Sequence, residues 1–304
     1  MEATRKDGEL ERLVTEAWDA AASDLDLRST DALVAAMNEA DATVAHAVAR
    51  VRPALVHVID AIVERLASGG RLVYAGAGTS GRLALIDAVE CGTTFGLPEG
   101  RVLALVAGGV ASTAAAQEQA EDDRDAGVLA IGSVDVGAAD AVVGVSASGR
   151  TPYAVGALEE AGRRGALTVA LACVEQSELA AAAEHEIAVV VGSEVIAGST
   201  RLKAGTAQKL VLNTISTVAM VRLGKTFGNL MVDVVATNDK LRARVRRIVR
   251  LATGVSADVA DETLDAAGGD AKVAIVALLA DVDVESARAR LEQAGGIVRK
   301  AIAR

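Results

Sequence analysis

The spacing of hydrophobic residues along the chain changes at about residue 70 and again at about residue 200. Between about residue 31 and residue 70, apolar positions recur every three or four residues, as on one face of a helix. Between Arg71 and about residue 191, short continuous apolar runs alternate with helical segments. From Lys203 onward the spacing is helical again and predicts no further strand. The pattern therefore predicts an α/β region flanked by helical segments.

The middle region predicts a five-stranded parallel sheet with helices on both faces. Strands that are apolar at consecutive positions are typical of strands buried on both faces. In such sheets, ligands bind at the carboxyl ends of the strands, which here selects the loops 76–81, 107–112 and 146–151. The candidate strands are 72–75, 102–106, 141–145, 168–171 and 187–191, and the helices between them are expected at about 80–91, 111–126, 152–164 and 177–183.

The two ends of the chain predict smaller, helical parts. Residues 1 to about 29 are acidic and weakly patterned, and a helix is expected after them, so residues 1–50 form an N-terminal arm and helix. A basic helix over 238–251 and three or four short helices after it predict a small C-terminal helical domain over 236–304. The central α/β domain then occupies residues 51–235.

Composition and charge narrow the classes of partner. The 304-residue chain is 51% hydrophobic, enough for a large core, but only 2% aromatic, so stacking platforms for bases are nearly absent. The net charge of -10 argues against nucleic acid and anionic membranes as partners. No stretch approaches the roughly 18 apolar residues of a membrane span, and no signal-peptide core is present. We therefore expect a cytoplasmic protein, and its two cysteines and three scattered histidines predict no metal site.

The first loop joins a strand to a helix through a glycine-rich turn. Residues 76–81 read GAGTSG and satisfy the spacing G-x-G-x-x-G, which alone is weak evidence for a dinucleotide site. The second strand, however, runs into residues 106–109 (VAGG) without the acidic residue that binds a ribose. Thr79 and Ser80 place hydroxyls next to the N–H groups of a helix N-terminus, which favours a phosphate monoester. A purely structural turn is the alternative.

A second loop of the same kind follows the third predicted strand. Residues 146–152 read SASGRTP, in which Thr151 can cap the next helix and Pro152 suits its first position. Either loop alone could be only a helix cap. Two hydroxyl-rich loops after parallel strands of one sheet are better explained by a shared anion site.

These loops resemble those of a known group of proteins. The motifs GAGTSGR and SASGRTP resemble the phosphosugar-binding loops of the sugar isomerase (SIS) superfamily. Over roughly residues 15 to 300, further segments such as AEDDRDAG and EVIAGSTRLKAGTAQKLVLNTIST resemble the N-acetylmuramic acid 6-phosphate etherases, in the same order. The resemblance implies an SIS-type five-stranded parallel sheet flanked by helices, with a small C-terminal helical domain.

The resemblance also implies a reaction. The family cleaves the D-lactyl ether at C3 of N-acetylmuramic acid 6-phosphate by elimination and water addition, giving N-acetylglucosamine 6-phosphate and D-lactate in cell-wall sugar recycling. In the open-chain sugar, C2 lies next to an aldehyde, so a base can remove its proton. A second group protonates the departing oxygen and then activates water. This chemistry needs no metal and no redox cofactor, so we expect none.

Residue roles are carried over from the family's motifs. Glu90 matches the acid, and Glu121 matches the base that removes the C2 proton. Each is also explained as a surface carboxylate at a helix end, and the acidic run offers Glu118, Asp122 and Asp123 as rivals for the base. The substrate-binding residues implied are Gly78, Thr79, Ser80, Gly81, Ser146, Ser148, Gly149, Arg150, Thr151, Ser199, Thr200 and Lys203. Ser199, Thr200 and Lys203 could equally belong to the capped start of a helix, with the cations of this segment in solvent.

The chain departs from the family after the proposed acid. Where the family reads Ser-Glu-Cys-Pro-Pro-Thr, residues 89–94 here read Val-Glu-Cys-Gly-Thr-Thr. The loss of two prolines is expected to loosen the turn that follows Glu90. This affects the positioning of the side chain more than the class of reaction.

The resemblance also bears on the assembly, and two rival functions stay open. A homodimer is expected, because SIS-type sites resemble ones that are completed across a subunit boundary. The first rival is a phosphosugar-sensing regulator, like the glucokinase regulators, which would need the loops but not both Glu90 and Glu121. The second is a sugar-phosphate isomerase on the same fold, which would use a single base.

Overall fold

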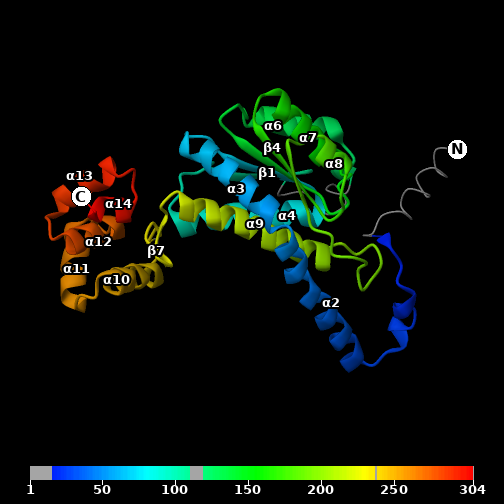
Figure 1. Ribbon diagram of the computed structural model, residues 1–304, viewed down its shortest axis with the longest axis horizontal. Helices are drawn as coiled ribbons and strands as arrows, with labels where there is room; N and C mark the ends of the chain where they lie inside the picture. The colour runs from blue at the N-terminus through cyan, green and yellow to red at the C-terminus, as the bar shows by residue number, and fades with distance from the viewer. Residues whose placement is uncertain (1–15, 110–118, 237, 304) are drawn as a thin grey trace. The chain divides into compact units, whose positions relative to one another are not determined.

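The computed structural model describes residues 16–109, 119–236 and 238–303 (Figure 1). Its Cα positions separate into two compact units. The first holds the residues up to Val89 together with Gly100–Ile215, and the second holds Glu90–Glu99 and the residues from Ser216 onward. Compactness does not show which parts fold independently, so the domain boundaries at residues 50 and 235 stay a prediction.

The first unit is built on a five-stranded parallel sheet with the strand order β2-β1-β3-β4-β5. Every residue of β1, β3 and β4 is buried, as the continuous apolar runs require. The predicted SIS-type sheet is therefore confirmed, with its last strand starting slightly earlier than expected. The strands are β1 (Leu72–Gly76), β2 (Val102–Val106), β3 (Ala141–Val145), β4 (Leu167–Ala172) and β5 (His185–Ala188).

Helices cover both faces of this sheet (Figure 1). On one face lie α6 (Arg124–Ser133), α7 (Pro152–Arg163) and α8 (Glu178–Ala181), and on the other lie α3 (Arg52–Ala67), α4 (Gly78–Phe95) and α9 (Lys203–Arg222). Before them come the short 3-10 turns η2 (Ala20–Ala22) and η3 (Leu25–Leu27) and the long helix α2 (Thr30–Arg50). This arrangement leaves the carboxyl ends of the strands to the connecting loops.

One predicted helix of the first unit has different bounds. The expected helix over 111–126 falls mostly on residues 110–118, which lie outside the described residues. Its expected end is wrong, because α6 is a new helix that starts at Arg124. The side chain of Asp123 accepts a hydrogen bond from the backbone N of Ala126 and so caps α6. An aspartate within the acidic run thus marks the start of a new helix.

The second unit contains a small hairpin that the sequence did not predict. The strands β6 (Thr226–Phe227) and β7 (Leu230–Met231) pair antiparallel, so the expectation of no strand after residue 191 is wrong. A strand of two residues is too short to show the alternation of apolar and polar side chains that indicates a β-strand. The Gly228-Asn229 turn between apolar residues, with Gly228 at φ 58°, is the signal that was available.

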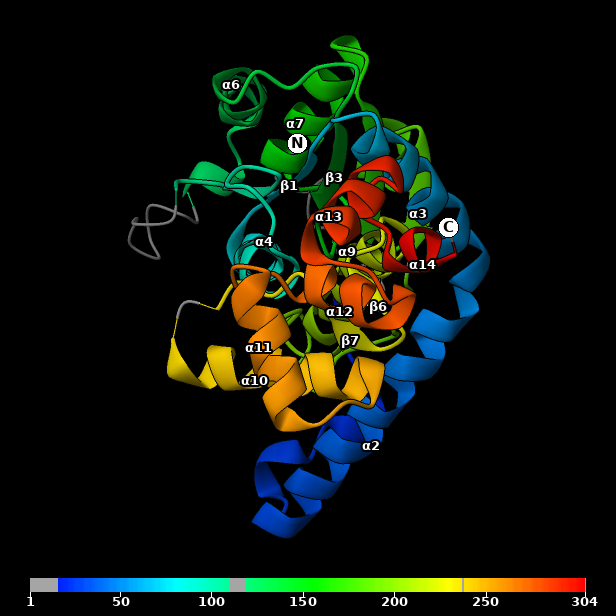
Figure 2. The same cartoon turned by 90° about the vertical axis from the view of Figure 1, so that its left-hand side faces the viewer.

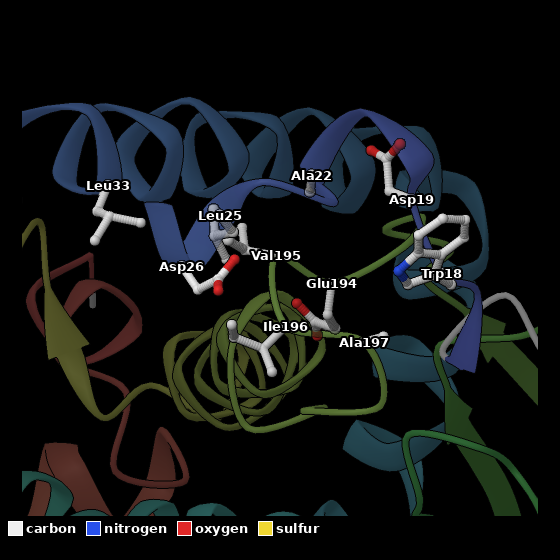
Figure 3. Close-up of a pocket in the computed structure, with 10 residues that line it drawn as sticks. All are labelled: Trp18, Asp19, Ala22, Leu25, Asp26, Leu33, Glu194, Val195, Ile196 and Ala197. Atoms are coloured by element: carbon white, nitrogen blue, oxygen red, sulfur yellow. The ribbon is translucent and has the colours of Figure 1, made fainter. Parts of the chain in front are cut away.

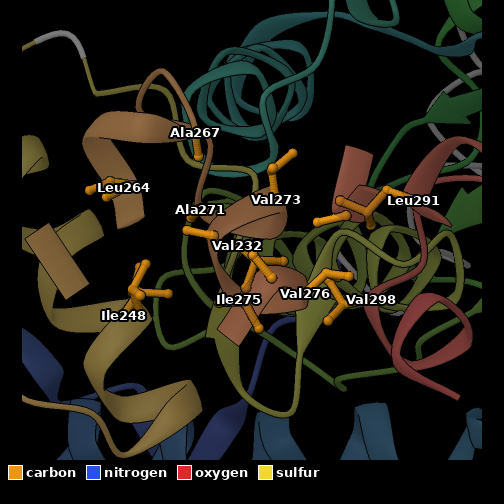
Figure 4. Close-up of a cluster of buried hydrophobic side chains, with 14 of the residues drawn as sticks. Val232, Ile248, Leu264, Ala267, Ala271, Val273, Ile275, Val276, Leu291 and Val298 are labelled. Atoms are coloured by element: carbon orange, nitrogen blue, oxygen red, sulfur yellow. The ribbon is translucent and has the colours of Figure 1, made fainter. Parts of the chain in front are cut away.

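The rest of the second unit is helical, as predicted. It holds α10 (Asp239–Thr253), α11 (Ala257–Ala266), α12 (Ala271–Ala280), α13 (Val284–Gln293) and α14 (Val298–Ile302). Helix α12 is central and contacts the other four (Figure 2). One buried hydrophobic cluster unites these helices, and it includes Ile248, Leu264, Ile275 and Val298 (Figure 4). In the described part of the chain, no helix has the length and apolar character that a membrane crossing requires.

An ion pair joins the beginnings of β1 and β3. Asp140 is buried, and its Oδ2 lies 2.7 Å from Nη2 of Arg71. Its carboxylate also accepts hydrogen bonds from the backbone N of Arg71 at 2.8 Å and from that of Gly137 at 3.0 Å. Burial raises the pKa of Asp140, but the hydrogen bonds from Arg71 and the backbone outweigh it, so the pKa lies below its ordinary value.

We predict that Asp140→Asn destabilises the fold and flattens its acid sensitivity. Because the folded pKa is depressed, the pair stabilises the protein above the unfolded pKa, and this contribution is lost as the pH falls through the folded value. The free energy of unfolding should fall by about 1–3 kcal/mol at neutral pH. Urea unfolding of both proteins at neutral and acid pH measures this. Asp135→Asn is the control, because the side chain of Asp135 is fully exposed. If the stability of Asp140→Asn fell with pH as steeply as that of the wild type, the prediction would be contradicted.

Candidate active site

A cavity of about 360 Å³ lies at the carboxyl ends of β1 and β3. These two strands pair directly, and β2 lies on the other side of β1, so the direction of the strand order reverses between them. Such a topological switch point is where open parallel sheets bind ligands. The cavity is lined by residues of the first unit: Glu16, Ala77, Gly78, Thr79, Ser80, Arg82, Glu121, Ser146, Ala147, Ser148, Thr151 and Thr200.

The first loop turns sharply into α4 through two glycines. Gly78 has a φ of 53°, in the left-handed region that other residues rarely adopt. A Cβ on Gly81 would lie 2.6 Å from the backbone O of Gly76, so a larger residue would push the loop away from the sheet. The turn places Thr79 and Ser80 in the first turn of α4, where unpaired backbone N–H groups favour an anion.

Glu121 is held by a chain of hydroxyls from the loop after β3. Oγ1 of Thr151 donates to Oε1 of Glu121 at 3.2 Å. Since a hydroxyl has one proton, Ser146, at 2.8 Å, must then donate to Thr151. In the 3.4 Å contact between Ser146 and Ser148, Ser148 is therefore the donor. The chain fixes one carboxylate oxygen of Glu121.

The other oxygen of Glu121 faces the first loop. A Cβ placed on Gly78 would lie 3.6 Å from Oε2 of Glu121, an ordinary van der Waals distance. The carboxylate thus lies between the loop after β1 and the loop after β3. Among the described residues of the acidic run, Asp122 and Asp123 are exposed and do not line the cavity, and Glu118 lies outside the described residues. Of the described members of this run, Glu121 is the one that lines the cavity.

The structure brings seven of the expected binding residues together and leaves five out. Gly78, Thr79, Ser80, Ser146, Ser148, Thr151 and Thr200 line the cavity, whereas Gly81, Gly149, Arg150, Ser199 and Lys203 do not. Gly81 and Gly149 are buried, and Arg150 is exposed. Lys203 is buried as well, and its Nζ donates a 2.7 Å hydrogen bond to the backbone O of Val191.

The segment before α9 is organised by a buried carboxylate. Both oxygens of Glu194 accept hydrogen bonds of 2.9 Å, from the backbone N of Lys203 and from that of Ala204. Glu194 thereby satisfies two of the free N–H groups at the start of α9. It also borders a second cavity of about 450 Å³, which is largely lined by apolar residues such as Trp18, Leu33 and Ile196 (Figure 3). The segment is thus a capped helix start that also contributes Thr200 to the site.

Glu90 lies on an exposed part of α4, in the stretch that belongs to the second unit. The departure after it does not produce the expected looser turn. Helix α4 continues through Gly92 and Thr93 to Phe95, because no proline interrupts it here. Oγ1 of Thr93 donates to the backbone O of Glu90 at 3.2 Å. The role of Glu90 as the acid stays a prediction.

Two charged residues line the cavity that the sequence did not single out. Arg82 follows the first loop directly in the motif GAGTSGR, so that motif was the available signal. Glu16 comes from the acidic N-terminal segment, to which the sequence assigned no role. A Cβ on Gly198 would lie 2.6 Å from Oε2 of Glu16, so Glu16 lies against the segment before α9. No cluster of three or more metal-ligating side chains occurs in the described ranges.

The strand order and the two hydroxyl-rich loops at its switch point define an SIS-type phosphosugar-binding protein. Two family models agree with this class. The glucokinase regulatory protein N-terminal SIS domain matches residues 54–161, and the SIS domain matches residues 132–217.

Relatives over the whole length define the family within that class. A protein of Rubrobacter xylanophilus named N-acetylmuramic acid 6-phosphate etherase is 56% identical over 296 residues, covering 97% of this chain and 98% of the relative. One of the same name from Escherichia coli O1:K1 is 47% identical, covering 97% and 99%. The chain belongs to the N-acetylmuramic acid 6-phosphate etherase family. Among solved structures, a phosphoheptose isomerase from Francisella tularensis has a TM-score of 0.49 at 17% identity, covering 64% of this chain and 100% of that chain.

Proposed function

We propose that this protein is a carbon–oxygen lyase that cleaves the D-lactyl ether of N-acetylmuramic acid 6-phosphate, within cell-wall amino-sugar recycling. The products are N-acetylglucosamine 6-phosphate and D-lactate. The observation that carries the proposal is the 56% identity, over nearly the full length of both chains, to a relative of that name. The position of Glu121 in a cavity lined by hydroxyls is consistent with it.

In this proposal the two loops bind the 6-phosphate. Backbone N–H groups at the start of α4 and the hydroxyls of Thr79 and Ser80 surround the anion on one side. Ser148 lines the cavity from the loop after β3, and Arg82 supplies a cation at the rim. Local dipoles and one cation thus hold an anion on a chain whose net charge is -10.

Glu121 acts as the base that removes the C2 proton of the open-chain sugar. The hydrogen bond from Thr151 orients the carboxylate, so that Oε2 faces the space beside Gly78. Removal of the proton next to the aldehyde gives an enolate, which expels the C3 oxygen as lactate. Glu90 protonates that departing oxygen and afterwards activates the water that adds at C3. Two carboxylates with separate roles are enough for this sequence of steps.

Turnover in ¹⁸O-labelled water tests the reaction. The protein is incubated with N-acetylmuramic acid 6-phosphate, and the products are followed by mass spectrometry. We expect D-lactate and N-acetylglucosamine 6-phosphate with one ¹⁸O at C3, because the new hydroxyl comes from water. Unphosphorylated N-acetylmuramic acid is the control and should turn over far more slowly. Binding without lactate would favour a phosphosugar-sensing regulator, and interconversion of aldose and ketose would favour an isomerase.

We also propose that the protein is a homodimer, in line with the expectation from its sequence. The N-terminal segments expose large apolar side chains, since Trp18 is 69%, Leu27 82% and Val34 54% exposed. Contact with a second copy would remove these side chains from water, which is favourable. Sedimentation equilibrium should give about twice the chain mass of 30.8 kDa, and a mass of one chain would contradict the proposal. The cytoplasmic location stays a prediction.

A further inference from the structure

Gln208 lies on α9 directly behind the first loop. Its side chain is 1% exposed, and Oε1 accepts a 2.9 Å hydrogen bond from Oγ of Ser80. Ser80 lines the cavity, whereas Gln208 does not. The amide therefore reaches the site only through the Ser80 hydroxyl.

The nitrogen of the Gln208 side-chain amide is in an unusual environment. Nε2 of Gln208 is buried and has no hydrogen-bond partner among the residues that the structure describes. Buried N–H groups in proteins are nearly always paired, because an unpaired donor loses its bonds to water without replacement. An apolar side chain of the same size would fill this space without that cost. Packing alone therefore does not explain why an amide side chain stands at position 208.

The direction of the hydrogen bond decides what Ser80 can offer a ligand. A hydroxyl carries one proton, and here Ser80 donates it to Oε1 of Gln208. Only the lone pairs of the Ser80 oxygen are then left for the cavity. A phosphate dianion accepts hydrogen bonds and cannot donate them. In this arrangement Ser80 cannot donate to a phosphate, although it stands in the first turn of α4, where one is expected.

We propose that Gln208 is a positioning residue for the anion site and that its amide turns when a phosphate binds. A half-turn of the amide exchanges Oε1 and Nε2, so that Nε2 donates to Oγ of Ser80. The Ser80 proton is then released toward the phosphate. The buried donor gains a partner, and the oxygen left in its place is better tolerated, since unpaired acceptors are less rare than unpaired donors. The inference rests on the proposed function, in which a 6-phosphate occupies this cavity.

Two substitutions separate the parts of this mechanism. Gln208→Glu leaves a carboxylate that can only accept, so it holds the Ser80 proton and repels the anion. Gln208→Met has a similar size and removes both donor and acceptor. We expect the KM for N-acetylmuramic acid 6-phosphate to rise about tenfold or more in Gln208→Glu and severalfold in Gln208→Met, the order of one hydrogen bond to a charged group. The kcat should change less, and Thr214→Val, on the same helix, should keep the wild-type KM.

A double-mutant cycle shows whether Gln208 acts through Ser80. Ser80→Ala alone should raise the KM, and adding Gln208→Met should raise it no further, because the coupled hydroxyl is already gone. Calorimetric titration with inorganic phosphate should show the same pattern of affinities. Additive effects, or a wild-type KM in Gln208→Glu, would overturn the proposal.

A thermal unfolding measurement separates this role from a structural one. Since Gln208→Met removes an unpaired buried donor, we expect it to keep or raise the Tm. A lower Tm with an unchanged KM would mean that Gln208 only supports the fold. A wild-type protein that binds phosphate but releases no lactate would overturn the proposed reaction and leave the Gln208 test in force. A wild-type protein that binds neither inorganic phosphate nor the sugar phosphate would overturn both.

Discussion

Glu121→Gln is expected to lower the kcat of lactate release by about 10³-fold, within the range that a positioned general base contributes. Glutamine keeps the size of the side chain and can still accept the hydrogen bond from Thr151, so the cavity should persist. What it loses is the capacity to take a proton from C2. In D₂O, lactate release and exchange of the C2 proton of the substrate should therefore both slow to that extent, while the KM changes little.

The neighbouring carboxylates provide the control for this experiment. Asp122→Asn removes an adjacent charge that is exposed and does not line the cavity. It should retain activity within about twofold, because exposed charges are strongly screened. If Glu121→Gln still exchanged the C2 proton, the base would have to be another group. Glu16 would then be the first candidate, since among the described residues it also lines the cavity with a carboxylate.

The sheet and the two loops were predictable because their signals are local. Continuous apolar runs indicated the buried strands, and glycines next to hydroxyls indicated the turns at their ends. The β6–β7 hairpin and the start of α6 were missed, because two-residue strands and a single capping aspartate leave almost no periodic trace. A pattern of apolar residues reports an element only when it lasts for several residues.

The site was predictable where a motif carried it and not where distant segments meet. The resemblance indicated Ser80 and Glu121, which the fold places in one cavity. Lys203 belongs to an equally specific segment, yet its ammonium group bonds to a backbone carbonyl instead. Gln208 lies 128 positions from Ser80 and is one of several polar residues in its helix. Such pairings depend on how helices pack on the sheet, which no local pattern encodes.

Glu90→Gln is expected to separate the two halves of the reaction. If Glu90 is the acid, its loss leaves the base intact, so the C2 proton should still exchange with solvent D₂O. The departing lactate oxygen, however, would have to leave without a proton. The kcat of lactate release should fall by about 10²–10⁴-fold, the usual contribution of a general acid. Proton exchange by NMR and lactate release by a coupled assay measure the two steps in one sample.

The pattern across the two glutamate variants then assigns the roles. Glu99→Gln, an exposed carboxylate in the same stretch 90–99, is the matched control and should behave as the wild type. Full lactate release by Glu90→Gln would remove Glu90 from the mechanism. Loss of both exchange and release would mean that Glu90 also supports the base step. Two separate groups predict a distinct pair of results. Glu90→Gln should still exchange the C2 proton but lose lactate release, whereas Glu121→Gln should lose both. A single shared carboxylate would instead couple the two steps in each variant.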